Sequence, residues 1–224
     1  MSQQPFVISR PAESILSTNK LIRNTYTLLS LTLLFSAVTA GISMQVAIPM
    51  INNPLVFLLG YFGLLFLTTH LRNSAWGLVS IFALTGFMGL TLGPILNFYI
   101  HQYANGGQLV MTALGGTGVI FLGLSGYALT TRKDFSFMGG YIMVGVLVAF
   151  LAGIGALIFQ IPALSLAVSA MFILLMSGYI LYQTSNMIHG GETNYIMATI
   201  GLYVAIYNLF LSLLRILSVL SGRR

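Results

Sequence analysis

A series of long apolar runs, separated by short polar connections, most constrains what this chain can fold into. A helix needs about 20 apolar residues to cross the hydrocarbon core of a bilayer. Runs of about this length lie at residues 24–47, 54–70, 75–98, 108–130, 136–159, 163–183 and 195–219. Only 5% of the residues are charged, so the chain cannot cover its surface with water-compatible groups as a soluble domain does. We therefore predict an all-α polytopic membrane protein, a seven-transmembrane-helix bundle.

The distribution of basic residues predicts how this bundle is oriented. Lys and Arg in short loops mark the cytoplasmic side. Residues 1–23 are expected to form a cytoplasmic N-terminal tail, 24–219 the seven-helix transmembrane domain, and 220–224 a short C-terminal tail outside. A re-entrant last segment would instead keep the terminal Arg223 and Arg224 inside, but about 25 residues suffice for a crossing. The tail and the second and fourth connections hold six basic residues, Arg10, Lys20, Arg23, Arg72, Arg132 and Lys133, and the first, third and fifth connections hold none.

The apolar runs lack the residue types that catalysis and transport commonly need. None contains Asp or Glu, the chain has no Cys, and the three His residues lie in three different connections. Proton-coupled transporters usually bury a carboxylate, and metal or serine hydrolases need acids and histidines that converge on one site. We predict no catalytic residues, no metal site and no cofactor. The positive charge at helix ends is expected to meet lipid headgroups rather than nucleic acid.

Polar residues are most concentrated in the last two runs. Gln183 and Asn186 are three positions apart and share a helix face, as do Asn208, Ser212 and Arg215 in the last run. One interpretation is a polar seam or ion path between the sixth and seventh helices. The other is a set of interhelical hydrogen bonds, with Arg215 extending its side chain to the headgroups.

Gly93, Pro94 and Asn97 form a second candidate site, near the end of the third run. Proline removes a backbone hydrogen bond and glycine lets another helix approach closely, so a break in the helix is expected here. It would serve either as a gate hinge or as a packing kink. The pair Gly89 and Gly93 favours a packing seam inside one chain.

The polar N-terminal segment is a third candidate site. It contains Arg10, Glu13 and Lys20 together with two prolines, which favours a flexible end. A cytoplasmic ATP-driven protease must grip such an end to pull on a membrane protein. The segment is therefore either a protease handle or a tail without a special role.

Residues 181–217, LYQTSNMIHGGETNYIMATIGLYVAIYNLFLSLLRIL, resemble the bacterial branch of the Bax-inhibitor family of membrane proteins. The segments at 21–40, 85–99 and 129–140 extend this resemblance over nearly the whole chain. It implies seven helices, an inner-membrane location, a cytoplasmic N-terminus and an external C-terminus. It also implies a partner, the membrane protease FtsH and its associated membrane proteins. Such members bind FtsH, restrain its proteolysis, and are themselves slow substrates, with the cytoplasmic tail as the starting point for degradation.

The same resemblance implies an alternative function. Other family members leak calcium in a pH-dependent way through a pair of aspartates on helices six and seven. These aspartates align with Gln183 and Ala205, which are neutral, whereas an arginine of that region is matched by Arg215. Three hypotheses remain: a regulator of FtsH, a calcium leak channel weakened by the missing aspartates, and a purely structural or assembly factor.

Overall fold

The chain is all-α over the residues that the computed structural model describes, 12–46 and 54–222, with side chains described from residue 20 onward. This confirms the all-α part of the predicted fold class. Residues 12–23, which we expected in the N-terminal tail, are helical and continue into the first apolar run. The helices are α1 (Ala12–Gln45), α2 (Pro54–Leu71), α3 (Trp76–Gln102), α4 (Gly106–Thr131), α5 (Met138–Ile158), α6 (Pro162–His189) and α7 (Tyr195–Ser221).

Six of the described helices, all except α2, are long and apolar enough to cross a membrane. The expected number of seven spans is thus not confirmed, because six helices are candidate spans and α2 is shorter. At 18 residues, α2 is about 27 Å long, slightly less than a hydrocarbon core of about 30 Å. The last helix, for which a re-entrant path was the alternative, has 27 residues and meets the requirement.

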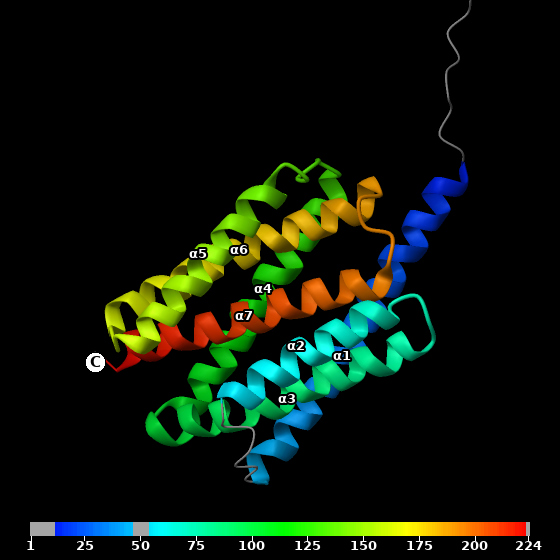
Figure 1. The fold of residues 1–224 in the computed structure, drawn as a ribbon. Helices are drawn as coiled ribbons and strands as arrows, with labels where there is room; N and C mark the ends of the chain where they lie inside the picture. Colours follow the sequence, from blue (N-terminus) through cyan, green and yellow to red (C-terminus); the bar gives the residue numbers. More distant parts are fainter. Residues whose placement is uncertain (1–11, 47–53, 223–224) are drawn as a thin grey trace, which may run out of the picture.

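Consecutive helices alternate in direction along the chain (Figure 1), and two hydrogen bonds link helix ends that lie on the same side. Asn194, between α6 and α7, donates to the carbonyl of Arg72, between α2 and α3. At the far side of the molecule, Asn105 before α4 donates to Ser221 at the end of α7. We call the side with the α1 start and the α2–α3, α4–α5 and α6–α7 connections the basic end, and the other the opposite end (Figure 1).

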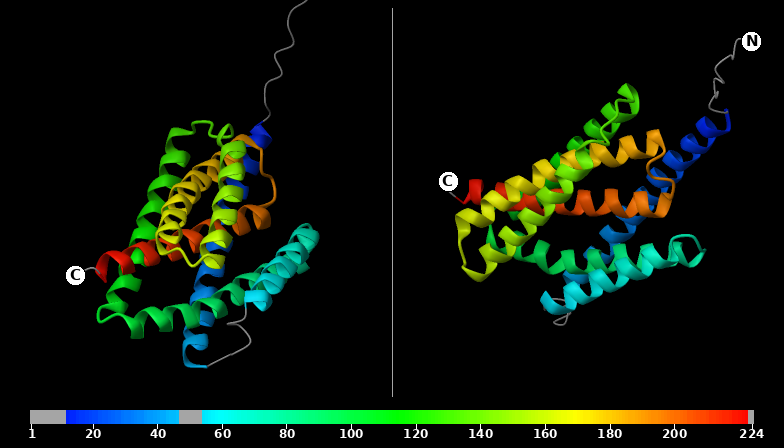
Figure 2. Two further views of the ribbon diagram at one scale, coloured as in Figure 1. Left: turned by 60° about the vertical axis from the view of Figure 1, so that its left-hand side comes forward. Right: turned by 45° about the horizontal axis from the view of Figure 1, so that its top comes forward.

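The core is built around α7, which packs against α1, α3, α4 and α6, while α2 lies on α3 and α5 lies on α6 (Figure 2). Leu202, Tyr203 and Leu209 of α7 are fully buried. By contrast α5 exposes large apolar side chains such as Tyr141 and Leu157. A helix that is apolar all round and exposes that surface needs lipid as its solvent, so α5 is expected to face the bilayer.

The closest helix approach is between α1 and α3, where glycine is required. A Cβ atom added at Gly93 would lie 2.6 Å from the Cβ of Ser43, and one at Gly89 would overlap the backbone of Ser36 and the hydroxyl of Thr39. Small residues let two backbones approach closely and gain van der Waals contact in a membrane, where the hydrophobic effect does not drive helices together. Gly89 and Gly93 thus contact α1 of the same chain, which favours the packing-seam interpretation.

Candidate functional site

The five residues of the expected polar seam are spread along α6 and α7 without contacting one another through hydrogen bonds. Gln183 is buried, and its amide has no hydrogen-bond partner among the described residues. The side chain of Asn208 donates to Val204 of its own helix at 2.8 Å. Arg215 is exposed near the opposite end. The seam is therefore not a continuous polar path in the part of the chain that is described.

The remaining two seam residues do not join a polar path either. The Asn186 carbonyl accepts the amide protons of Gly191 and Glu192, which closes the C-terminus of α6 where Gly190 adopts a left-handed conformation. Such a closure satisfies carbonyls that the last turn leaves free. Ser212 is buried in α7. Sharing a helix face did not bring these residues together, because α6 and α7 run in opposite directions and their polar positions lie at different depths.

The candidate hinge in α3 is fastened to α1. We expected the helix to break at Pro94, but it continues through the proline to Gln102. Proline at position 94 leaves the Leu90 carbonyl without its usual donor, and the Ser43 hydroxyl donates to that carbonyl at 2.6 Å. One turn further on, the Asn97 amide donates to the Met44 carbonyl at 2.7 Å. These two bonds favour a fixed packing kink rather than a moving gate.

A set of tyrosine and serine or threonine hydroxyls joins α1, α3 and α7 in the middle of the bundle. Tyr203 Oη and Ser36 Oγ are 2.6 Å apart, and Tyr203 also donates to the Thr85 carbonyl at 3.3 Å. One turn along α7, Tyr207 Oη lies 3.1 Å from Thr91 Oγ1. We call these residues the hydroxyl network. It satisfies buried polar groups with neutral partners, at a position where an ion pair would carry a large desolvation cost.

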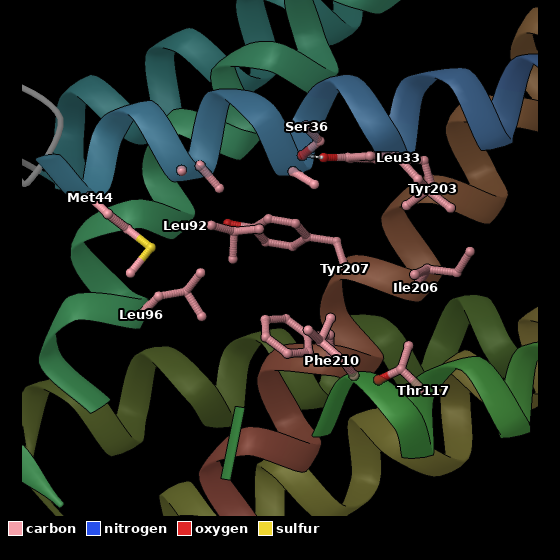
Figure 3. Close-up of a pocket in the computed structure, with 14 residues that line it drawn as sticks. Leu33, Ser36, Met44, Leu92, Leu96, Thr117, Tyr203, Ile206, Tyr207 and Phe210 are labelled. Carbon is pink, nitrogen blue, oxygen red and sulfur yellow. Dashed lines mark hydrogen bonds between the residues drawn. The ribbon is translucent and has the colours of Figure 1, made fainter. Parts of the chain in front are cut away.

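A pocket of about 250 Å³ lies beside the hydroxyl network, between α1, α3, α4 and α7. The Tyr207 ring lies across it, and the bond between Ser36 and Tyr203 lies at its upper edge (Figure 3). Its other lining residues are mostly apolar and none is charged. Calcium requires six to eight oxygen ligands, usually with carboxylates among them. The pocket fits an apolar group and does not supply a calcium site.

The basic end is held together by side chains that connect its loops. The Ser185 hydroxyl accepts the amide proton of Phe135 at 2.9 Å and donates to the Lys133 carbonyl at 3.2 Å. Asn194 accepts amide protons of Ile196 and Met197 and so caps α7. Its bond to Arg72 then ties that cap to the α2–α3 connection. The exposed basic residues of this end lie on the first part of α1 and on the two connections that these bonds hold; they are Lys20, Arg23, Arg72, Arg132 and Lys133.

Asp134 is the one acid in the α4–α5 connection and stabilises its turn. Its carboxylate accepts the Ser136 hydroxyl at 2.6 Å and the Ser136 amide at 2.8 Å. These hydrogen bonds lower the pKa of Asp134 below its usual range, because they favour the charged form. The carboxylate is therefore ionised at neutral pH. Among the described residues no cluster of His, Asp or Glu could hold a metal ion.

The expected protease handle lies at the basic end. Arg10 lies outside the described residues, Glu13 is in the first turn of α1 but its side chain is not described, and Lys20 is exposed. The first turns of α1 extend beyond the neighbouring helices, at the upper right of Figure 1. The first turns of α1 are thus accessible from the basic end.

Comparison with known proteins identifies the family. The family model described as inhibitor of apoptosis-promoting Bax1 matches residues 18–222. This chain belongs to that family. It is 52% identical over 95% of its length to a protein of Escherichia coli named modulator of FtsH protease YccA, and covers 96% of that protein. A counterpart in another Escherichia coli strain, equally similar, is named inner membrane protein YccA. An uncharacterized protein of Pseudomonas aeruginosa is 53% identical, over 99% of both chains.

The family assignment identifies a membrane protein whose relatives are named for regulation and location rather than for an enzymatic reaction. Sequence reasoning missed the hydroxyl network, although Tyr203 and Tyr207 are one helical turn apart. That spacing was the available signal, because it places both tyrosines on one face of the last run.

Proposed function

We propose that this chain binds the FtsH protease in the inner membrane, restrains its degradation of other membrane proteins, and is itself degraded slowly. The observation that carries the proposal is the 52% identity, over nearly the whole length, to a protein named modulator of FtsH protease. The accessible start of α1 and the lack of carboxylates in the described spans also support it. The proposed location follows the relative named inner membrane protein, with the N-terminus and the basic end placed in the cytoplasm by their Lys and Arg content.

The mechanism we propose is competition by a substrate that starts easily and unfolds with difficulty. Residues 12–23 precede the apolar run of α1, which begins at Asn24, and as a helix they extend about 18 Å beyond it. Together with residues 1–11 they give the protease a segment to hold. Further pulling must then separate α1 from α3, where the backbones are closest and Ser43 and Asn97 link the two helices. FtsH would remain occupied while that step is slow.

The experiment compares full-length protein with a variant lacking residues 1–19 in bacterial membranes, by following turnover of the chain and of a second FtsH substrate. We expect deletion to lengthen the half-life of the chain and to release the second substrate from restraint. A matched control replaces residues 1–19 with an unrelated flexible segment of equal length, which should restore turnover. Unchanged turnover after deletion, with FtsH active on the second substrate, would exclude the handle. Recovery of FtsH with the tagged chain in mild detergent tests binding separately.

A further inference from the structure

A pocket at the opposite end of the bundle has no role in the proposed function. It lies beneath the tight turn between α5 and α6 and has a volume of about 450 Å³. Arg215 of α7 forms one wall, Gln160, Ile161 and Pro162 form the turn above it, and Ser165 of α6 lies inside. The three polar side chains that line it, of Gln160, Ser165 and Arg215, can each donate a hydrogen bond, and none of them is a carboxylate.

Arg215 has no anionic partner. No salt bridge involves it, and the two acids with described side chains, Asp134 and Glu192, both lie in connections of the basic end. It lies six residues before the end of α7, about 9 Å along the helix axis. A guanidinium at this depth needs a counter-charge or water, and its planar set of five donors suits carboxylate or phosphate oxygens.

The N-terminus of α6 borders the same pocket, through Pro162 and Ser165. Its first backbone bond is from the Ser165 amide to the Ile161 carbonyl, and Ile161 provides no side-chain cap. The amide protons of Ala163 and Leu164 therefore have no acceptor among the described residues. The helix has 28 residues, and its aligned peptide dipoles place roughly half a positive charge at this end. Such an end binds phosphate well.

Ser165 gives an independent indication of a ligand. Only 8% of the residue is exposed, it lines the pocket, and its hydroxyl has no hydrogen-bond partner within the described structure. A polar side chain of a largely buried residue normally finds a hydrogen-bond partner, and this hydroxyl is open to the pocket rather than sealed among other side chains. A phosphate oxygen between Arg215 and the α6 N-terminus would accept this bond.

We propose that this pocket binds a phosphate group, held by the Arg215 guanidinium, the Ser165 hydroxyl and the backbone at the α6 N-terminus. Two sources share this chemistry: the headgroup of an anionic phospholipid and free inorganic phosphate. The apolar side chains around the pocket favour the phospholipid over free phosphate. Leu157 and Phe159, beside the pocket, expose roughly three-quarters of their surfaces, 74% and 73%, and would lie along acyl chains of a lipid whose headgroup entered it.

The test measures binding to the full-length chain, purified in a non-ionic detergent, by native mass spectrometry and by a shift in thermal unfolding. The probes are short-chain phosphatidylglycerol, the diacylglycerol with the same chains but no phosphate, and inorganic phosphate. We expect phosphatidylglycerol to bind about tenfold more tightly than diacylglycerol, the value of one charge-assisted hydrogen bond. A response to inorganic phosphate that competes with the lipid would assign the site to free phosphate.

Two variants and one control decide whether phosphatidylglycerol binds in this pocket. Arg215→Gln should weaken the binding of phosphatidylglycerol about tenfold. Ser165→Ala should weaken it about fivefold, because this change removes one neutral hydrogen bond. Arg132→Gln, which removes an exposed arginine at the basic end, should leave binding within twofold. If the wild-type chain binds neither phosphate probe, the proposal is wrong. An equal loss in Arg132→Gln and Arg215→Gln would overturn it too. Ser165→Ala serves alone if Arg215→Gln does not fold.

Discussion

Replacing Gly89 by alanine is the most direct test of how the bundle is held together. The added Cβ would overlap the backbone oxygen of Ser36 and would lie 2.9 Å from its Cα, so α1 and α3 must move apart. Overpacking of this kind typically costs about 1–3 kcal/mol. The better helix propensity of alanine returns up to about 1 kcal/mol. We therefore expect a net loss of about 1–2 kcal/mol in the free energy of unfolding.

Gly115→Ala is the matched control, because it makes the same chemical change on α4 where no atom lies within 4 Å of the added Cβ. We expect its stability to be unchanged or slightly greater. The assay is unfolding of the purified protein in mixed micelles by increasing amounts of a denaturing detergent, followed by circular dichroism. A difference of about 2 kcal/mol between the variants would be roughly a 30-fold difference in the ratio of folded to unfolded protein. Equal stability of the two variants would refute the close α1–α3 contact.

Three further predictions address the polar groups. In the same unfolding assay, Tyr203→Phe should lower the free energy of unfolding by about 1 kcal/mol, because it removes two interhelical hydrogen bonds. Tyr207→Phe removes one such bond and should lower it by about 0.6 kcal/mol. The pKa of Asp134 is lower in the folded chain than in the unfolded chain, so its stabilisation of the turn is complete above the unfolded pKa and is lost as the pH falls through the folded pKa. Hydrogen-exchange protection of the Ser136 amide should fall over the same pH range. This protection should be absent in Asp134→Asn. Liposomes containing the purified chain should show no calcium flux at acidic or neutral pH, with an ionophore as positive control; flux above that of protein-free liposomes would revive the leak hypothesis.

The sequence predicted the fold class because lipid imposes a simple rule. Each long apolar run must be a helix that satisfies its own backbone hydrogen bonds, and this needs no knowledge of tertiary contacts. The ends of the helices were less predictable. Residues before Asn24 and after Phe98 extend α1 and α3 beyond the apolar runs, since a helix can continue into water where hydropathy gives no signal.

The candidate sites depended on contacts between helices, which the sequence of one helix does not contain. Pro94 predicted a break, yet Ser43, about 50 residues earlier, donates to the carbonyl that the proline leaves free. Arg215 and Gln183 were grouped by polarity and by their places on α6 and α7. The structure instead places Arg215 against the α5–α6 turn. Helix-face arguments identify which residues point together on one helix, but the partner is set by packing.

The arrangement of α1 explains how slow degradation and an accessible handle can coexist under the proposed function. A segment that is easy to hold would ordinarily make a chain a good substrate. Here the handle leads directly into the helix that packs most closely on its neighbour, so the first helix to be pulled is also among the hardest to remove. Gly89→Ala should therefore shorten the half-life of the chain in membranes containing FtsH, whereas Gly115→Ala should not. If both variants turned over like the wild type while the detergent assay separated them, extraction of α1 would not limit degradation.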